Sequence, residues 1–243
     1  MPSPVQMYQR EMHDNVGFFA TWLPGDRIEI GDAGVFVGGR FRKMSSLKEL
    51  GIEYTIEKGP TTQELKYTAT SGVKLQTAAG AGVTTLGKAE ISVEFSQAGS
   101  FVFHASGLQQ VSIKERQSVA KQLLTAIEQK AWQMDWFLVE SLRTTERATI
   151  IVSEESSGGI VLDAHAQAPL PGISLADPHI SLNIRSMHGK IVHVIGEGGL
   201  HPLYSCLQMR RKFFGIPKLQ PVRGVDAGEE AFTRAGIGAL LES

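Results

Sequence analysis

The chain has 243 residues, and its 24 Lys and Arg against 25 Asp and Glu give a formal net charge of −1, which argues against a basic nucleic-acid face across the whole domain. Apolar residues make up 42% and charged residues 20%, which is typical of a folded protein rather than a disordered one. The single cysteine, Cys206, allows no internal disulfide and fits a reducing compartment. Without a secretion signal in residues 1–15 or an apolar run of about 18 residues, we expect a soluble, cytoplasmic protein.

Short elements are expected in the first 60 residues. Pro4 suits the first turn of a short helix that ends near His13. Ser46 and Glu49 have the spacing of a capping box for a single helical turn. The strand candidates are FFATWL (18–23), RIEI (27–30), VFVGGRF (35–41) and the alternating IEYTIE (52–57).

Residues 88–108 carry the clearest strand alternation. In 88–96 one face is apolar, with Ala89, Ile91, Val93 and Phe95, and the other face is polar, with Glu90, Ser92 and Glu94. After a turn at 97–100, Phe101, Phe103 and Ala105 resume an apolar face. The pattern predicts a β-hairpin with a turn of about four residues.

Residues 112–131 form the strongest helix candidate. Ser112 and Glu115 have capping-box spacing, and the apolar stripe consists of Val119, Leu123, Leu124, Ile127 and Ala131. Trp132 and Trp136 are expected to lock this helix onto the sheet. Five strands are predicted to follow, at 136–142, 148–153, 159–166, 179–186 and 190–195, with a solvated loop at 154–159.

Patterns of catalytic residues are weak. The GEGG run at 196–199 lacks the Lys and Ser/Thr of a phosphate loop, and Cys206 has no nearby acid or base. A metal-dependent hydrolase using Asp163, His165 and His179 is a minor alternative, because the spacing matches no known ligand pattern. We therefore predict no enzyme, cofactor or metal. The basic run at 210–212, followed by two phenylalanines, suits an anionic membrane surface or a nucleic acid, or is a solvated cluster at the end of a strand.

The stretch KLQTAAGAGVTT (74–85) has few side chains large enough to build a core. Little packing is lost when such residues move, so the stretch can be a loop or short helix in one state and a strand in another. An ordinary surface hairpin beside a flexible loop is the other interpretation, and the pattern alone favours it. The segments 88–96 and 100–108 each have about the 9–11 residues that a strand needs to cross a bilayer.

Three stretches resemble the bacterial gasdermins, a family of pore-forming cell-death proteins. They are SGVKLQTAAGAGV (71–83), KAEISVEF with SFVFHA (88–105), and FLVESLRTTERATIIVSEESSGGIVLDA (137–164). The resemblance implies a twisted β-sheet domain that a short C-terminal peptide holds inactive. It also implies that a protease removes the peptide and that freed copies assemble into a membrane pore.

The expected fold is α+β, with a twisted, mainly antiparallel sheet, a packed helix and a short C-terminal segment. Residues 1–214 form the sheet domain, the Gly- and Pro-rich residues 215–228 a linker, and 229–243 an autoinhibitory segment. The resemblance implies an effector of bacterial immunity that is cytoplasmic when latent and located at the inner membrane when activated. Its partners would be an activating protease, membrane lipids and further copies of itself, with no nucleic acid. The alternative is a non-catalytic binding or scaffold protein.

The site residues follow from the same interpretation. Two membrane hairpins are expected, at 70–108 and 148–166, with lipid-facing side chains Ile91, Val93, Phe95, Phe101, Phe103, Ile150, Val152, Ile160 and Leu162. The autoinhibitory latch would be Phe232, Ile237, Leu240 and Leu241. Candidate cleavage positions are Lys218, Leu219, Arg223 and Asp226.

Overall fold

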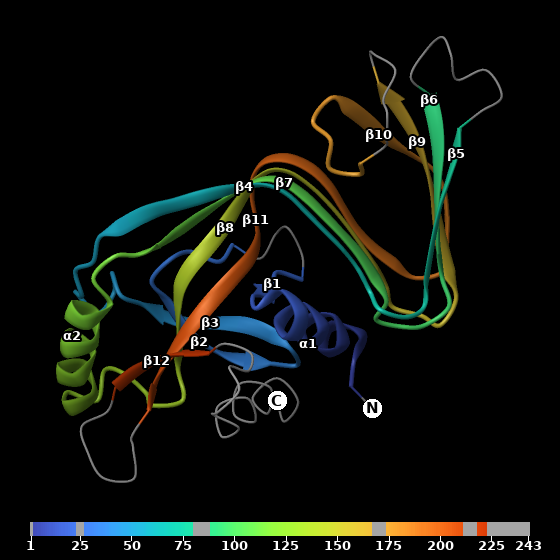
Figure 1. The fold of residues 1–243 in the computed structure, drawn as a ribbon. Coiled ribbons are helices and arrows are strands. Elements are labelled where there is room, and N and C mark those ends of the chain that lie inside the picture. The colour runs from blue at the N-terminus through green and yellow to red at the C-terminus, as the bar shows by residue number, and fades with distance from the viewer. Residues whose placement is uncertain (1, 23–26, 80–87, 167–173, 211–217, 223–243) are drawn as a thin grey trace. The chain divides into compact units, whose positions relative to one another are not determined.

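The computed structural model describes residues 2–22, 27–79, 88–166, 174–210 and 218–222 (Figure 1). These residues form mainly antiparallel strands with two helices, α1 (Pro4–Val16) and α2 (Arg116–Glu128), which confirms the α+β class. Neither of these helices is long and apolar enough to cross a membrane.

The described strands form two sheets. The larger has the order β1 (Phe19–Ala20), β11 (Ile191–Arg210), β8 (Phe137–Ser153), β2 (Asp32–Val37) and β3 (Arg40–Ser46). Three further strands join it: β12 (Lys218–Val222) pairs with β11, β4 (Ile56–Thr68) pairs with β7 (Phe101–Ile113), and β7 pairs with β8. The smaller sheet has the order β10 (Ile180–His188), β9 (Gly158–Ala166), β6 (Lys88–Phe95) and β5 (Val73–Ala79), and its neighbours are antiparallel.

The chain divides into two compact units. Unit 1 contains Met1–Tyr8, Thr61–Leu108 and Thr145–Leu200, and unit 2 contains Gln9–Pro60, Gln109–Thr144 and His201–Ser243. Both units draw on the residues predicted as the sheet domain, 1–214. The chain passes from one unit to the other within α1 and within the four long strands β4, β7, β8 and β11.

Unit 2 is built around α2 and an aromatic cluster. Val119, Leu123 and Ala126 of α2 are buried against residues that include Leu138 and Trp132, and Trp136 packs at the edge of this cluster, as expected. The second cluster joins four aromatic residues, Phe19, Phe36, Phe137 and Tyr204, with neighbouring ring centroids 4.9–5.6 Å apart.

The predicted capping of α2 is wrong. Ser112 is buried at the end of β7, and the helix begins at Arg116 with no side-chain hydrogen bond at its N-cap, Glu115. Arg116 instead pairs with the buried Glu140 of β8, with 2.6 Å between Nη2 and Oε2. This ion pair fixes the start of the helix on the sheet, since a carboxylate buried in this way needs a cation beside it.

Several N-terminal strand predictions are also wrong. Residues 27–30 are not a strand, and within 18–22, the described part of the strand predicted at 18–23, only Phe19–Ala20 form one. The strand predicted at 52–57 begins at Ile56, because Glu53 is held through both its backbone groups by the Gln122 side chain of α2. The turn at 47–50 is present, with the Glu49 N–H donating to Ser46 Oγ at 3.2 Å.

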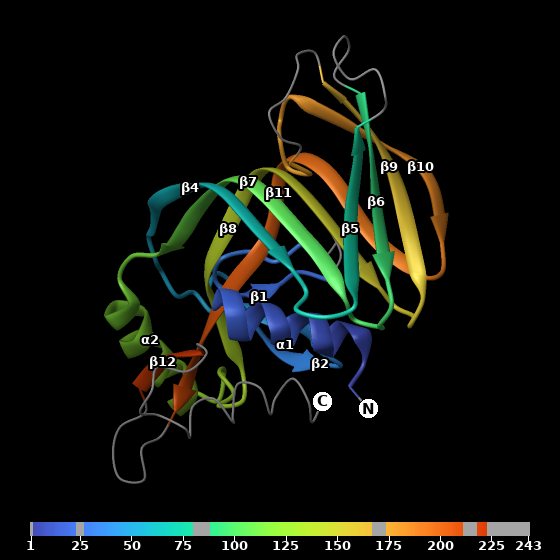
Figure 2. The ribbon, with the colours of Figure 1, turned by 45° about the vertical axis from the view of Figure 1, so that its right-hand side comes forward.

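The hairpin predicted over 88–108 is wrong as well. β6 pairs with β5 and β9 in the small sheet, whereas β7 pairs with β4 and β8 in the large sheet. The turn between them reverses the chain, but it carries the chain from one sheet to the other (Figure 2). The KLQTAA part of the small-residue stretch lies in β5, and residues 80–85 lie outside the described residues.

Candidate functional site

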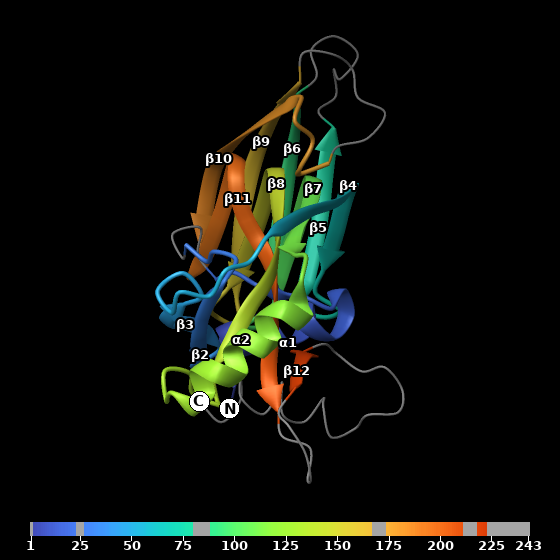
Figure 3. The ribbon, with the colours of Figure 1, turned by 90° about the vertical axis from the view of Figure 1, so that its left-hand side faces the viewer.

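Every strand of the small sheet continues through a short link into a strand of the large sheet. The links are 69–72 (β4 to β5), 96–100 (β6 to β7), 154–157 (β8 to β9) and 189–190 (β10 to β11), and all lie in unit 1. The small-sheet order β10, β9, β6, β5 matches the order β11, β8, β7, β4 of the large sheet, and Figure 3 shows the two series running across the view in the same order. Unit 1 therefore contains two layers of strands. Each of the four strands of one layer continues, after a single fold at its link, into a strand of the other layer.

Neighbouring links are hydrogen-bonded to one another or, in one case, to the last residue of the strand beside them. The Ser96 N–H donates to Gly72 O at 2.9 Å, and the Gly99 N–H donates to Ser153 O at 2.8 Å. The Glu154 N–H then donates to Lys190 O at 2.8 Å. We call residues 69–72, 96–100, 154–157 and 189–190 the link row.

Glycine is required at two points of the link row. Gly72 has φ +77°, and a Cβ there would lie 2.3 Å from Ser100 Oγ. Gly189 has φ +76°, and a Cβ there would lie 2.6 Å from Ser157 O. Because L side chains rarely adopt positive φ, these reversals depend on glycine.

An apolar cluster, here the interlayer core, fills the space between the two layers. Residues of the small sheet contact Val102 of β7 and Ile151 of β8. The exposed fraction of the buried residues in this cluster is 4% or less. The small-sheet members are Ile91, Val93, Phe95, Ile160, Leu162, Ala164 and Ile180. Cross-strand rows connect them: Val93 lies opposite Leu75 and Ile160, and Ile160 lies opposite Met187.

The nine predicted lipid-facing residues are all buried, but they do not share one face. Five of them belong to the interlayer core: Ile91, Val93, Phe95, Ile160 and Leu162. The other four, Phe101, Phe103, Ile150 and Val152, alternate with Val102 and Ile151 and so belong to the opposite face of β7 and β8. Phe101, for example, packs against Tyr8 and Tyr67, with centroids 4.6 and 5.6 Å away.

Sequence reasoning missed Val102, Ile151, Leu175 and Ile180 of the interlayer core. The available signal was that 101–103 and 150–152 are apolar without interruption, which is typical of strands buried on both faces. Leu175 carries no such signal, because it stands in a Pro- and Gly-containing stretch that resembles a loop.

The outer face of the small sheet is polar. Glu90 of β6 lies opposite Asp163 of β9, and Arg185 of β10 pairs with both, with 3.1 Å from its Nη2 to Asp163 Oδ1. Farther along, His188 Nε2 lies 3.8 Å from Glu94 Oε2. The small sheet is therefore amphipathic, with apolar side chains toward the large sheet and a charged ladder outside.

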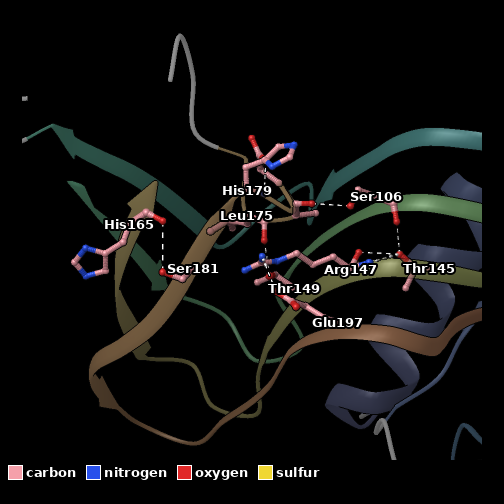
Figure 4. Close-up of polar contacts among 11 residues, drawn as sticks. Ser106, Thr145, Arg147, Thr149, His165, Leu175, His179, Ser181 and Glu197 are labelled. Carbon is pink, nitrogen blue, oxygen red and sulfur yellow. Dashed lines mark hydrogen bonds and ion pairs between the residues drawn. The ribbon is translucent and has the colours of Figure 1, made fainter. Parts of the chain in front are cut away.

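Residues 174–176, here called the strap, fasten the connection between β9 and β10 to the large sheet (Figure 4). The Thr149 hydroxyl donates to Leu175 O at 2.6 Å, and the Ser106 hydroxyl donates to Ala176 O at 2.7 Å. Leu175 and Ala176 are almost completely buried, and the Ser174 hydroxyl donates to the Glu64 carboxylate of β4. The strap is thus held by polar groups from three strands of the large sheet.

Two titratable groups near the strap have shifted pKa values. Burial, reinforced by the positive charge of Lys66, lowers the pKa of His104 from 6.5 to about 4, although Glu64 acts in the opposite direction. Partial burial raises the pKa of Glu64, but the hydrogen bonds from Ser174 and Lys66 outweigh it and leave that pKa below its ordinary value. Beside the strap, Arg147 of β8 is buried and pairs with Glu197 at 3.0 Å.

The described residues do not bring together the side chains that the catalytic alternatives require. Among the described residues, no three His, Cys, Asp or Glu side chains gather as a possible metal site, so Asp163, His165 and His179 are not brought together. Cys206 is buried, and burial together with the nearby Glu140 raises the pKa of its thiol well above the ordinary value.

The C-terminal predictions fall partly outside the described residues. Lys218 and Leu219, which were expected in the linker, belong to β12 and lie opposite Arg210 and Met209 of β11. Arg223 and Asp226 lie outside the described residues, as do Phe232, Ile237, Leu240 and Leu241.

Comparison with known proteins assigns no family to the chain. No protein-family model matches the sequence, and no curated protein matches it. The functional interpretation therefore depends on the geometry of the link row, the interlayer core and the strap.

Proposed function

We propose that the protein is a latent, non-enzymatic pore former, in which the small sheet swings away from the large sheet and enters a membrane as two β-hairpins. The observation that carries this proposal is the matching strand order of the two layers. Removal of the C-terminal segment by a protease permits the change, and several copies then assemble in the membrane to kill or arrest the cell.

Straightening the four links preserves every strand pair of unit 1. Because β10, β9, β6 and β5 continue into β11, β8, β7 and β4, neighbours in one layer are also neighbours in the other. The change costs the bonds of the link row, the strap and the contacts of the interlayer core, but no backbone ladder within either layer. Such an element has two arrangements available to the same set of strands.

The straightened chain forms two hairpins. The first joins β4–β5 to β6–β7 around residues 80–87, and the second joins β8–β9 to β10–β11 around residues 167–179. The second hairpin thus consists of β9 and β10, in place of the expected 148–166, because β8 and β9 belong to different sheets. The four residues Phe101, Phe103, Ile150 and Val152 stay in the large sheet.

Each small-sheet strand has the length and the two faces that a bilayer requires. A strand together with its link has about 11–13 residues, and a tilted strand crosses the hydrocarbon core with about 9–11. The side chains that now form the interlayer core would face lipid. The ladder of Glu90, Asp163 and Arg185 would face water in the pore.

The edges of the small sheet favour pairing between copies. In the described residues, β5 pairs only with β6 and β10 only with β9, so each leaves one edge open. Strand directions alternate across the four strands, so the β10 edge of one copy meets the β5 edge of the next in antiparallel fashion. Exposed aliphatic side chains stand on both edge strands: Leu75 on β5, and Ile184 and Met187 on β10. Pairing around a closed ring satisfies the backbone groups that lipid cannot.

Cleavage after β12 suits this account better than cleavage within it. Lys218 and Leu219 are paired in a strand, and a protease needs an extended, accessible backbone. Arg223 and Asp226 follow the strand and are the preferred positions. Loss of the residues beyond them removes the proposed latch of Phe232, Ile237, Leu240 and Leu241.

Dye release from liposomes tests the proposal. The full chain receives a recognition sequence for a site-specific protease in place of residues 223–228, and a matched chain receives a scrambled, uncleavable sequence. Release from anionic liposomes only after cleavage of the first chain is the expected result. If both chains remain folded by circular dichroism and the cleaved chain releases nothing, the pore-forming proposal fails and the binding or scaffold alternative gains.

A further inference from the structure

His104 lies between the layers, on the face of β7 that holds the strap. Val102, two residues earlier, belongs to the interlayer core, and Ser106, two residues later, donates to Ala176 O of the strap. Because strand side chains alternate, His104 shares this face with both of them. It is only 7% exposed, and its Nδ1 has no hydrogen-bond partner among the described residues.

Few groups around His104 can stabilise a positive charge on its ring. The neighbouring strand β4 contributes Glu64 and Lys66, whose charges oppose one another and whose side chains are 2.9 Å apart. On β8, Arg147 is already paired with Glu197 of β11. At the end of the strap, Asp177 accepts the His179 N–H at 2.8 Å. The inward face of β6 and β9 is aliphatic and aromatic, with Val93, Ile160 and Leu162.

We infer that His104 is a pH-sensitive catch for the strap: its protonation loosens residues 174–176 and, with them, the attachment of the small sheet to the large one. Of the carboxylates on β4, that of Glu64 is the one that acts on the His104 ring. That carboxylate already accepts the Ser174 hydroxyl and pairs with Lys66, so the imidazolium either remains unpaired and buried or competes with the strap for Glu64. Both outcomes weaken the closed arrangement.

The direction of the effect follows from proton linkage. The pKa of His104 is about 4 in the closed state, and opening to water returns it to about 6.5, so the open state binds more protons as the pH falls. The free energy that favours the closed state over the open state is greatest above pH 6.5 and falls between pH 6.5 and 4. Between pH 7 and pH 5 the equilibrium shifts toward the open state by about 20-fold.

Hydrogen exchange of the full chain measures this opening without a membrane. Protection factors of amides in 174–182, corrected for intrinsic exchange rates, are compared at pH 7 and pH 5, with the amides of α2 as the reference in unit 2. The variants are His104→Gln and His104→Asn, which keep a polar side chain but cannot be protonated. His179→Gln, an exposed histidine beside the strap, is the matched control.

The expected result is an approximately 20-fold loss of protection at 174–182 in the unmodified chain and in His179→Gln, with a loss of less than about 3-fold in both His104 variants. A full loss in the His104 variants, or none in the unmodified chain, overturns the inference. If neither variant folds, NMR titration of the His104 ring in the unmodified chain decides: titration near pH 6.5 with the strap still protected overturns it.

The role of this catch in activation rests on the proposed function, but its test does not. Strap opening that depends on His104, without dye release at any pH, would leave the catch in place and refute only the pore. Release by cleaved protein at a rate independent of His104 and pH would refute the role of the catch in activation and leave the pore.

Discussion

Truncation of Leu175 to alanine tests whether the strap belongs to the interlayer core. Leu175 is 2% exposed and packs in the cluster that contains Ile151 and Ile160. The change removes three carbon groups, which cost about 2.4 kcal/mol at about 0.8 kcal/mol each. A cavity term adds to this, so we expect the free energy of unfolding to fall by about 3 kcal/mol. The hydrogen bonds from Thr149 and Ser106 remain and should keep the strap in place.

Urea unfolding followed by circular dichroism measures this loss by linear extrapolation. Ile184→Ala is the matched control, because Ile184 is an aliphatic residue on the neighbouring β10 but is 41% exposed, and its truncation should cost less than about 1 kcal/mol. Hydrogen exchange at 174–182 should also rise in the Leu175 variant more than in the control. Equal destabilisation by the two substitutions would refute the placement of Leu175 in the core.

Three further predictions concern the link row, the base of α2 and the latch. Gly72→Ala should lower the free energy of unfolding in urea by about 2–3 kcal/mol, because Gly72 has positive φ and an added Cβ would lie 2.3 Å from Ser100 Oγ. Gly198→Ala is the control: its φ is also positive but no atom lies within 4 Å, so it should cost about 1 kcal/mol. Equal costs would contradict the close packing of the link row. Arg116→Met should lower the free energy of unfolding by about 3 kcal/mol, because it leaves the Glu140 carboxylate buried without a cation. Adding Glu140→Leu should restore most of the lost stability. Additive losses in this double-mutant cycle would count against the ion pair. Replacing Leu240 and Leu241 together by aspartate should cause dye release without cleavage, and a folded variant that releases nothing would argue against the latch.

The alternating patterns of the sequence were sufficient to locate strands but not to assign them to sheets. The period-two pattern of Ile91, Val93 and Phe95 identified β6 and its buried face correctly. Turn residues such as Gly99 predict a chain reversal, but a hairpin and a link between layers need similar turn chemistry. What distinguishes them is which strands provide the backbone partners: β6 pairs with the preceding β5 and the distant β9, whereas β7 pairs with β4 and β8.

Buried polar residues explain the failure to recognise β8 as one strand. Its middle, RTTER, has the composition of a loop, so the sequence predicted two strands with a break. Thr145 and Arg147 are nevertheless buried, because the Thr145 hydroxyl donates to Ser106 O and Arg147 pairs with Glu197. Both Ser106 and Glu197 are about 40 or more positions away in the sequence, so local patterns cannot reveal that these polar groups are satisfied.

The strap was the part of the candidate site least accessible to sequence reasoning. Its burial depends on the hydroxyls of Ser106 and Thr149, two small polar residues within strongly apolar strands. Such residues usually indicate only a tolerated polar position. In this fold each donates to a different backbone carbonyl of the β9–β10 connection, a role that becomes visible only when the strands are placed in space.

The most direct test of the central claim compares fluorescent labels at two adjacent positions of β10. Ile184 lies opposite Leu162 of the interlayer core, and Asn183 lies opposite Asp163 of the polar face, yet both are exposed and tolerant of a dye. Each is replaced by cysteine in a Cys206→Ala background that carries the protease recognition sequence at 223–228. The cysteine is labelled with a fluorescent dye, and the chain is then cleaved in the presence of liposomes. If the small sheet inserts as proposed, a lipid-attached quencher will act on the label at 184 and aqueous iodide on the label at 183. If iodide quenches both labels equally and the lipid quencher neither, the small sheet does not enter the membrane.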